Sequence, residues 1–317
     1  MIGGINLSVS DCYDFEVQDI DRTVSFLESM KQSLIDLHVH SNFSDGDQSP
    51  LELIRLAKEA NVSILSIADH DTILGIRSLT DKKVEVIDGV TVVSGVELSA
   101  QIKHGRMHVL GYGIDLTNKK LNDTLKYLHE RSISAVLTII EQIKKDYGII
   151  FTDSEVEQII QSQHNVNRVD VAKKCVEKGY AIHVQDAFDK YLVDAFLKTR
   201  GKNDKGLPYA ECISLIKEAG GIPVLAHPKT LELENKEFYK KLEEFIDLGL
   251  EGIEVYHSSY TEDESQFYRE VADKYHLLCS GGTDFHGKSI KPGIFLGTGK
   301  NNNVKIKQLS ILDRLID

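Results

Sequence analysis

Histidines and carboxylates recur in this chain where short apolar runs begin or end. His38 and His40 follow the first of these runs, and Asp284 and His286 follow the last. Residues two apart in an extended segment point to the same face, so His38 and His40 can bind one ion together. The complete set of candidate metal ligands is His38, His40, Asp45, His70, Glu97, His108, His227, Asp284 and His286.

Imidazole and carboxylate ligands together suit zinc, manganese or iron. A single histidine is more often a hydrogen-bonded or surface residue, but half of the 12 histidines occupy such positions, beside three carboxylates. Because this set is too large for one ion, we expect more than one. Adjacent ions that share a carboxylate hold both the attacking and the leaving oxygen in phosphoryl chemistry. The pattern therefore predicts metal-dependent hydrolysis of a phosphoester.

The elements that must position these residues alternate between strands and amphipathic helices. We expect strands at residues 34–37, 62–68, 90–98, 107–112, 222–226, 252–256 and 276–280, and helices at 50–60, 72–79, 209–219, 238–248 and 262–275. This alternation is typical of an α/β fold with a mostly parallel sheet. In parallel α/β barrels the active site lies at the carboxyl-terminal rim, where residues far apart in the sequence converge.

From about residue 116 to 208 the pattern changes to helices alone. Apolar residues at helical spacing predict one long helix over 119–147, and Thr152 with Glu155 forms a capping box that opens another. Further helices are expected at 169–178 and 184–192. We therefore predict an N-terminal extension at 1–33, a barrel formed by 34–115 and 209–317, and an inserted helical subdomain at 116–208. A helix within the extension is expected to pack on the barrel.

Composition limits the classes of partner and compartment. With a net charge of −12, the chain lacks the basic surface that duplex DNA requires. Apolar runs such as 135–140 are too short to span a membrane, and no signal peptide is recognisable. The 4 cysteines are far apart and form no C-x-x-C pair, as expected for reduced cytoplasmic thiols.

Several short segments resemble the polymerase-and-histidinol-phosphatase (PHP) superfamily across about residues 34–290. They are His38-x-His40 with Asp45, Asp69-His70-Asp71, Gly95-Val96-Glu97, His227-Pro228, and Gly282-Thr283-Asp284-Phe285-His286-Gly287. The helical insertion resembles one branch, whose members hydrolyse nucleoside 3′,5′-bisphosphates or 5′-monophosphates or trim RNA from its 5′ end. The resemblance implies a distorted (β/α)7 barrel that holds up to three divalent ions. Manganese is the expected metal, and zinc, iron or magnesium would also suit.

The resemblance also implies a role for each ligand. His38, His40, Glu97 and Asp284 would bind the first ion; Glu97 would bridge to the second, joined by His108 and His227; Asp45, His70 and His286 would bind the third. A hydroxide that bridges two ions would attack phosphorus in line. The expected catalytic residues are Glu97, Asp284, His227 and Arg168, and the expected substrate is a small nucleotide.

The chain departs from the branch at one element of the substrate site. The branch has Arg-Pro-His, whereas this chain has Arg168-Val169-Asp170. Arg168 suits a bidentate phosphate clamp, and a surface ion pair with Asp170 or Glu177 is the alternative. This departure affects the expected identity of the substrate and does not affect the expected hydrolytic chemistry.

Four further residues lie beside the ligand set. His257 is expected to contact the substrate or to orient a ligand histidine, and the same roles are open for Glu254, for which a structural hydrogen bond is preferred. Asp69 and Asp71 flank His70 and are expected to orient ligands. Three rival functions remain: a histidinol phosphatase, a 5′-3′ exonuclease on short RNA or DNA, and a non-catalytic metal-binding module.

Overall fold

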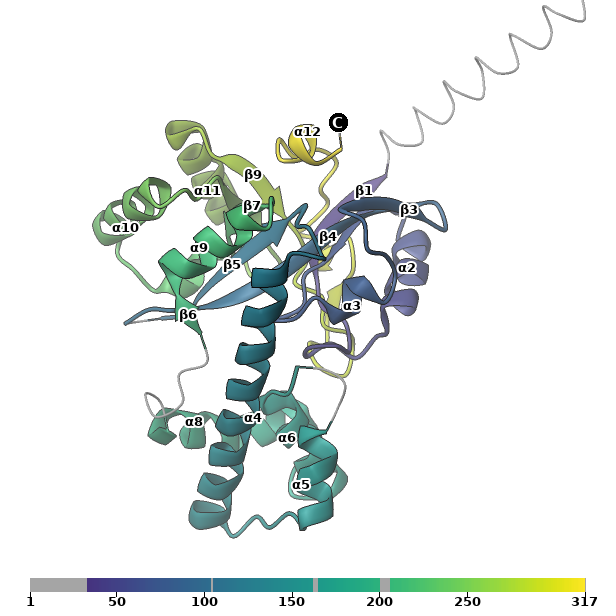
Figure 1. Cartoon of the computed structure of the whole chain (residues 1–317), viewed down its shortest axis with the longest axis vertical. Coiled ribbons are helices and arrows are strands. Elements are labelled where there is room, and N and C mark those ends of the chain that lie inside the picture. Colours follow the sequence, from purple (N-terminus) through teal and green to yellow (C-terminus); the bar gives the residue numbers. More distant parts are fainter. Residues whose placement is uncertain (1–32, 104, 162–164, 200–205, 317) are drawn as a thin grey trace, which may run out of the picture.

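The computed structural model describes residues 33–103, 105–161, 165–199 and 206–316. The helix expected within the N-terminal extension lies outside these residues. Figure 1 shows a sheet-containing part with helices packed around it, and a second group of helices at one end of the molecule.

Seven strands follow one another in the main sheet. Their order is β1 (Leu34–Val39), β2 (Val62–Ile67), β4 (Val90–Gln101), β5 (Met107–Tyr112), β7 (Ile222–Leu225), β8 (Gly252–Tyr256) and β9 (Leu278–Gly281). Neighbouring strands run parallel except at β5, which is antiparallel to both β4 and β7. The α/β prediction with a mostly parallel sheet is confirmed.

The two edges of this sheet meet beyond β9. The Asp284 amide donates to the His38 carbonyl at 2.8 Å, and the His40 amide donates to the Phe285 carbonyl at 2.8 Å. These bonds join β1 to the segment that follows β9 and close a distorted barrel. Four of the predicted ligands therefore lie on the two sides of this seam.

Some short strands were not predicted. The strand β3 (Val84–Ile87) pairs antiparallel with β4 through a turn at Asp88 and Gly89, which have φ of 50° and 83°. The Asp-Gly pair is a strong hairpin signal that the sequence interpretation overlooked. The other short strands are β6 (Leu207–Pro208), which pairs with β4, and β10 (Ile294–Phe295), which pairs with β11 (Gly299–Lys300).

Helices cover the outside of the sheet, and all of them except the short α12 lie near predicted positions. They are α2 (Pro50–Glu59), α3 (Leu74–Arg77), α9 (Tyr209–Glu218), α10 (Asn235–Asp247), α11 (Glu262–Tyr275) and α12 (Leu312–Leu315). Helix α2 shows the local reasons: Ser49 caps its first turn in a capping box, Pro50 opens it, and Leu53 and Ala57 are fully buried on one face. That apolar face packs on the strands and holds the helix in place.

The regular structure described between β5 and β6 is entirely helical. It comprises α4 (Lys119–Tyr147), α5 (Asp153–Ile160), α6 (Arg168–Glu177), α7 (Val184–Ala187), a π-helical turn η1 (Phe188–Leu192) and α8 (Val193–Thr199). The predicted helix at 184–192 thus widens at Phe188 and continues to Thr199. Buried side chains such as Val136, Ile143, Val171 and Leu192 form a core within this group. The domain boundaries at 115/116 and 208/209 stay predictions.

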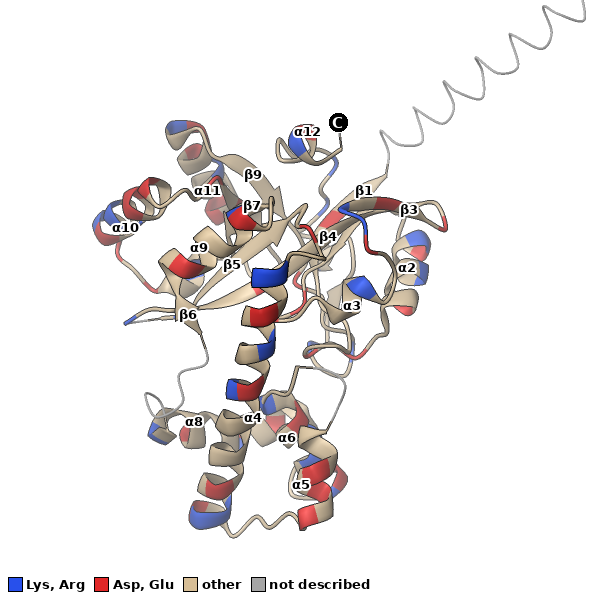
Figure 2. Cartoon of the chain, in the orientation of Figure 1, with Lys and Arg blue, Asp and Glu red and all other residues tan. Residues whose placement is uncertain are grey.

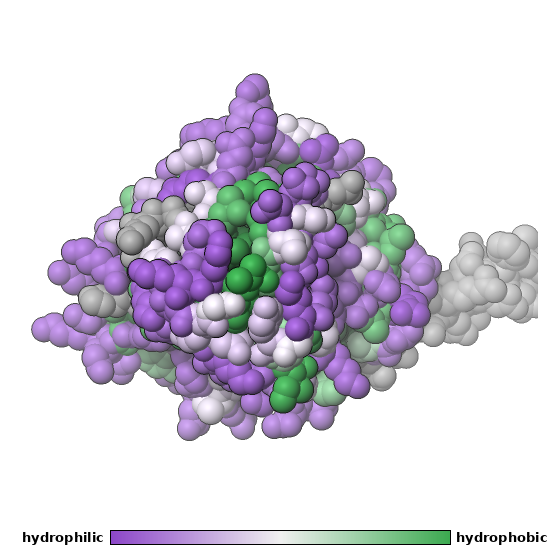
Figure 3. All heavy atoms as spheres, turned by 90° about the horizontal axis from the view of Figure 1, so that it is seen from below, coloured by the Kyte–Doolittle hydropathy of each residue, from purple (hydrophilic) through white to green (hydrophobic). Residues whose placement is uncertain are grey.

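The surface of the molecule is mixed in charge. Figure 2 shows basic and acidic residues interspersed along α4 and α10, whereas α5 carries acidic residues and no Lys or Arg. Seen from the end that carries the second group of helices, apolar surface interrupts a hydrophilic surround (Figure 3), and exposed apolar side chains of these helices include Val193 and Leu197. Among the described helices, none is both long enough and apolar enough to cross a bilayer.

Candidate active site

All nine predicted ligands lie together at one rim of the barrel. Their side-chain atoms form four overlapping groups, each with its ligand atoms within 4.8 Å of one another. Because β5 runs antiparallel to β4, its first residues lie beside the last residues of β4, with His108 paired to Ser99. This reversal explains how a residue at the start of a strand joins residues at the ends of the others.

Glu97 stands at the centre of the cluster and is fully buried. Its Oε1 atom lies 2.8 Å from Nδ1 of His108 and 2.8 Å from Nε2 of His227. Its Oε2 atom lies between 3.1 and 3.2 Å from a ring nitrogen of each of three histidines, His38, His40 and His70. One carboxylate thus faces five imidazoles, which is the arrangement expected of a bridging ligand.

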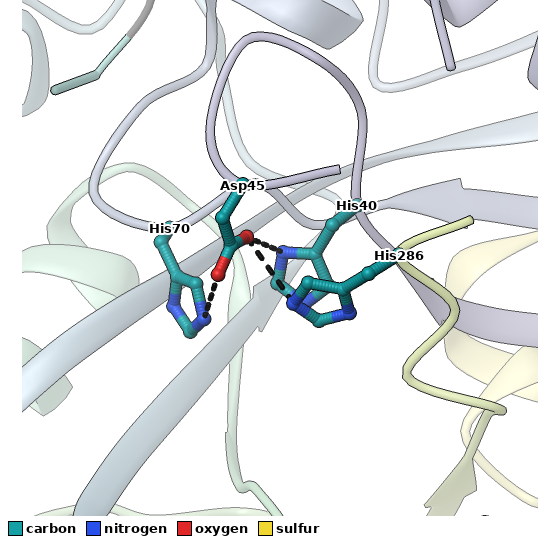
Figure 4. Close-up of side chains that lie close together, drawn as sticks. All are labelled: His40, Asp45, His70 and His286. Carbon is teal, nitrogen blue, oxygen red and sulfur yellow. Dashed lines mark ion pairs between the residues drawn. The ribbon is translucent and has the colours of Figure 1, made fainter. Parts of the chain in front are cut away.

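A second carboxylate, Asp45, gathers the group shown in Figure 4. Its Oδ1 atom lies 3.2 Å from Nε2 of His286 and 3.6 Å from Nδ1 of His40, and its Oδ2 atom lies 3.8 Å from Nε2 of His70. The predicted third-ion set contained Asp45, His70 and His286. In the structure His40 belongs to this group as well as to a group with His38 and Asp284.

Asp284 has two different surroundings. Its Oδ1 atom lies 3.2 Å from Nε2 of His40 and 3.4 Å from Nδ1 of His286. Its Oδ2 atom lies 3.3 Å from Nε2 of His257 and accepts a hydrogen bond of 2.6 Å from Nζ of Lys291. His257 is therefore adjacent to a predicted ligand. Lys291 was missed, because nothing in its sequence context separates it from a surface lysine.

Several imidazole nitrogens in the cluster lack hydrogen bonds. Both ring nitrogens of His40 and Nδ1 of His70 are buried and make no hydrogen bond of acceptable geometry to any described residue. Buried polar atoms without partners are rare, because each costs the free energy of its lost hydration. A divalent ion would satisfy these nitrogens, and the surrounding carboxylates would balance its charge, so the donor set fits metal binding.

Glu254 contacts two of the predicted ligands, His38 and His227. Its Oε1 atom lies 2.8 Å from Nδ1 of His38, and its Oε2 atom accepts the backbone N–H of His227 at 2.6 Å. With Nδ1–H donated to Glu254, Nε2 of His38 is free to face the cluster. The hydrogen bond preferred for Glu254 is present, and it is made to a predicted ligand.

The substitution Glu254→Gln is expected to weaken metal binding by roughly 10- to 100-fold, the usual cost of losing a residue that orients a ligand. The side-chain amide of the new glutamine has one acceptor oxygen in place of two. It would therefore either place its N–H group against the N–H of His227 or no longer accept a hydrogen bond from the His38 ring. Metal titration followed by calorimetry measures the change. Glu251→Gln, near the start of the same strand, is the matched control, and equal affinities in the two variants would contradict the role.

Three buried aspartates join neighbouring segments of the rim in the same way. Each carboxylate accepts both the backbone N–H and the hydroxyl of one serine or threonine at 2.6–2.9 Å: Asp36 from Thr283, Asp69 from Ser41, and Asp71 from Ser99. Asp69 and Asp71 were expected to orient ligands, and these bonds show them holding the ligand-bearing segments. Asp36 was not predicted, although it stands two residues before His38.

Burial and neighbouring charges shift the pKa values of the side chains in the cluster. Burial by itself would lower the pKa of His40, but Asp284, Glu97 and Asp45 together raise it to about 9. For His70, burial dominates over the nearby carboxylates and lowers the pKa to about 3. Burial would raise the pKa of Glu97, but His70, His108 and His38 hold it well below its usual range.

These shifts predict that the metal-free protein is most stable near neutral pH. Unfolded histidine titrates near pH 6.5. Below that pH the unfolded chain gains a proton that folded His70 does not bind until about pH 3, so stability falls as the pH falls. The stabilisation from protonated His40 is complete below pH 6.5 and is lost as the pH rises through about 9. In chelator, Tm is expected to peak between pH 6 and 7, and a Tm that rises steadily from pH 5 to 9 would contradict this.

A cavity of about 730 Å³ opens beside the cluster. Six of the predicted ligands line it, and so do side chains of the helical region that include Ile139, Phe188 and Phe196. Arg168 lines the same cavity with its guanidinium 4.2 Å from the Phe196 ring centre. Burial lowers the pKa of Arg168, and Arg106 on the opposite loop adds to this, so two cationic groups influence each other in this cavity.

The alternative for Arg168 was a surface ion pair. Glu177, one of the two acids considered, pairs instead with Lys174 at 2.6 Å. The other, Asp170, accepts the backbone N–H of Asn167 at 2.8 Å. Arg168 lies on the wall of the cavity, and its role toward a ligand there stays a prediction.

Comparison with known proteins identifies the family. The chain matches the PHP domain family over residues 36–283. It is 31% identical over 254 residues to a 5′-3′ exoribonuclease of Haemophilus influenzae, an alignment that covers 79% of this chain and 89% of that protein. It is 27% identical over 252 residues to a 3′,5′-nucleoside bisphosphate phosphatase of Chromobacterium violaceum, with 80% and 87% covered.

The fold comparison agrees with the class of enzyme. A crystal structure from Bifidobacterium adolescentis, described as a metal-dependent phosphoesterase, superimposes with a TM-score of 0.69 and 25% identity, and 90% of this chain and 97% of that chain are covered. The family match runs from within β1 to residue 283, just after β9, and includes seven of the nine predicted ligands, from His38 to His227. The chain therefore belongs to the PHP family, and it is a metal-dependent phosphoesterase.

Proposed function

We propose that the chain hydrolyses a phosphomonoester of a small nucleotide, either a nucleoside 3′,5′-bisphosphate or a 5′-monophosphate, with two to three divalent ions, manganese foremost. The observation that carries this proposal is the composition of the cavity. The same cavity is lined by six of the predicted ligands and by Arg168 with Phe188 and Phe196. A phosphate and a flat, partly apolar nucleoside need these two kinds of surface side by side.

Different residues of the chain would have different roles in hydrolysis. When bound, the ions supply an activated water and neutralise charge on the phosphoryl group. Glu97 and Asp284 hold ligand histidines on both sides and fix the geometry in which that chemistry occurs. Arg168 would bind phosphoryl oxygens through two parallel N–H bonds, which adds charge stabilisation in a site shielded from water. His257, against Asp284, would contact the substrate at the rim.

A second candidate activity is removal of nucleotides from the 5′ end of short RNA. The relative in Haemophilus influenzae, which bears that activity in its name, is 31% identical over most of both chains. The same ligand wall would serve a phosphodiester, since the chemistry at phosphorus is shared. Whether the chain acts on a single nucleotide or on the 5′ end of RNA depends on the length of nucleic acid that the cavity can hold.

The proposal is tested by product release after chelation and addition of manganese. Adenosine 3′,5′-bisphosphate, AMP, histidinol phosphate and a 5′-phosphorylated oligoribonucleotide are compared at equal concentration, with phosphate and released nucleotide measured separately. Phosphate from a nucleotide supports the proposal. Mononucleotides from the oligomer support the second candidate, preference for histidinol phosphate rejects both, and turnover of none of the four favours a non-catalytic module.

The substitution Arg168→Ala is expected to raise the KM for a nucleotide by roughly 10- to 100-fold, because hydrogen bonds to charged groups contribute about 1.5–3 kcal/mol each. The control is Lys174→Ala, which removes one positive charge from the same helix at a residue paired with Glu177. Steady-state kinetics on both variants measure the difference. Unchanged KM in Arg168→Ala would restore the surface interpretation.

A further inference from the structure

The short connection formed by residues 165–167, just before α6, lies against two loops of the barrel rim. Asn165, which is 5% exposed, donates its backbone N–H to the carbonyl of Phe43 at 2.8 Å. Its side-chain Nδ2 donates to the carbonyl of His70 at 2.8 Å. The Nδ2 of Asn167 donates to the carbonyl of Ser44 at 3.0 Å. Three hydrogen bonds thus tie this connection to the main chain of the rim.

The loops bound in this way carry the carboxylate-centred group of Figure 4. Ser44 directly precedes Asp45, and the carbonyl bonded by Asn165 belongs to His70 itself. Asp45 and His70 are neighbours in the group with His40 and His286. A shift of either asparagine amide would therefore move the backbone from which one of these side chains projects.

The same connection also opens the helix that carries Arg168. The Oδ1 atom of Asn167 accepts the N–H of Val169 at 2.7 Å and caps α6, and Arg168 is the first residue of that helix. The Arg168 guanidinium is held over the Phe196 ring at 4.2 Å. The single side chain of Asn167 therefore bonds both the start of α6 and the loop before Asp45.

We propose that Asn165 and Asn167 are positioning residues that hold Arg168 and the ligands Asp45 and His70 in one rigid frame. The proposal rests on the proposed function in one respect, since it takes Arg168 to bind the phosphate of the substrate. A phosphoryl group held by Arg168 would then lie at a fixed position relative to the ion that Asp45, His70 and His286 would hold. Such placement matters because a displacement of about 1 Å can cost roughly 100-fold in rate.

The tests use variants that separate this role from simple support of the fold. Asn165→Ala removes the bond to His70, and Asn165→Asp keeps the shape of the side chain while it replaces the donor. Asn167→Ser retains a capping hydroxyl for α6, since serine is a good cap, but loses the amide that reaches Ser44. Gln161→Ala, at the exposed end of α5, is the matched control.

Metal binding is measured first, by the number of manganese ions retained per chain and their affinities. We expect both Asn165 variants to bind one ion roughly 10-fold or more weakly and to bind the others as the unmodified protein does. This measurement needs no substrate, so it tests the positioning role even if the chain hydrolyses none of the nucleotides offered. Unchanged manganese affinity in Asn165→Asp, with a folded protein, would overturn the proposal.

Kinetics then test the coupling to Arg168. Asn167→Ser is expected to lower kcat/KM for the nucleotide roughly 10-fold at unchanged Tm. The double variant Asn167→Ser/Arg168→Ala is expected to lose no more than Arg168→Ala alone, because a misplaced arginine and an absent one have the same consequence. Additive losses of kcat/KM in the double variant, or a lower Tm as the sole change in Asn167→Ser, would contradict the positioning role. Either result would mean that the asparagines only support the fold.

Discussion

Replacement of Glu97 by alanine is expected to abolish turnover and to remove more than one ion from the protein. Its two oxygens face five histidines, two through Oε1 and three through Oε2. Loss of one shared carboxylate would leave these rings without the charge that balances bound cations. If the lost stabilisation of the reaction is about 4 kcal/mol, the rate falls about a thousandfold. Metal content and single-turnover kinetics measure the two effects together.

The control for Glu97→Ala must separate charge from folding. Glu97→Gln keeps the volume of the side chain in a position that is fully buried, and circular dichroism reports whether the barrel persists. Asp115→Ala, at an exposed turn after β5, removes one carboxylate without touching the cluster. A folded Glu97→Ala protein that keeps its full complement of ions and measurable turnover would show that Glu97 is not the shared ligand.

Removal of all divalent ions is expected to have the other large effect. Chelation should eliminate turnover, and manganese added in excess should restore it. The chelated protein should also unfold more readily, because ions that bind only the folded state stabilise it by about 2.7 kcal/mol at 100 times their Kd. An unfolding entropy of about 2.1 cal/mol/K per residue gives about 1.5 °C per kcal/mol for a chain of 317 residues, so Tm should fall by roughly 4 °C per ion.

Calorimetry with and without chelator measures this change, and Glu97→Ala provides the comparison. In that variant the difference between chelated and metal-supplied protein should shrink, because fewer ions bind. Turnover that survives exhaustive chelation, verified by elemental analysis, would contradict the metal-dependent chemistry itself. Activity restored by zinc or iron and not by manganese would leave the chemistry in place and correct the choice of ion.

The ligand positions were predictable because strand ends are visible in sequence. Short apolar runs followed by histidine or carboxylate are local patterns, and parallel strands bring such ends to one rim. The structure assembles the nine residues so identified. The direction of β5 was not predictable, because apolar alternation is the same in either direction along a strand. His108 was identified from its residue type and its place at the start of a run.

Other features depend on contacts that no local pattern reveals. Asn165 and its acceptor at His70 are 95 residues apart, and that acceptor is a main-chain carbonyl that every residue possesses. Lys291 likewise acquires meaning only through its bond to Asp284. By contrast, the hairpin of β3 was legible in Val-Ile-Asp-Gly-Val, and its omission was an error of interpretation. The partition of ligands among ions stays a prediction, with His40 shared between two groups.

The seam between β1 and the segment after β9 determines at what stage of synthesis the full cluster of predicted ligands can form. A ribosome delivers His38 and His40 early, whereas Asp284 and His286 emerge only after both parts of the barrel and the helices between them have been made. At about 5–20 residues per second, the growing chain exposes those two histidines for many seconds without the carboxylate that completes their group. The groups that include Asp284 or His286 can therefore form only after those residues have been made, whereas the groups around Glu97 with His108 and His227 do not need them. A chain that stalls before Asp284 would hold fewer ions than a finished one.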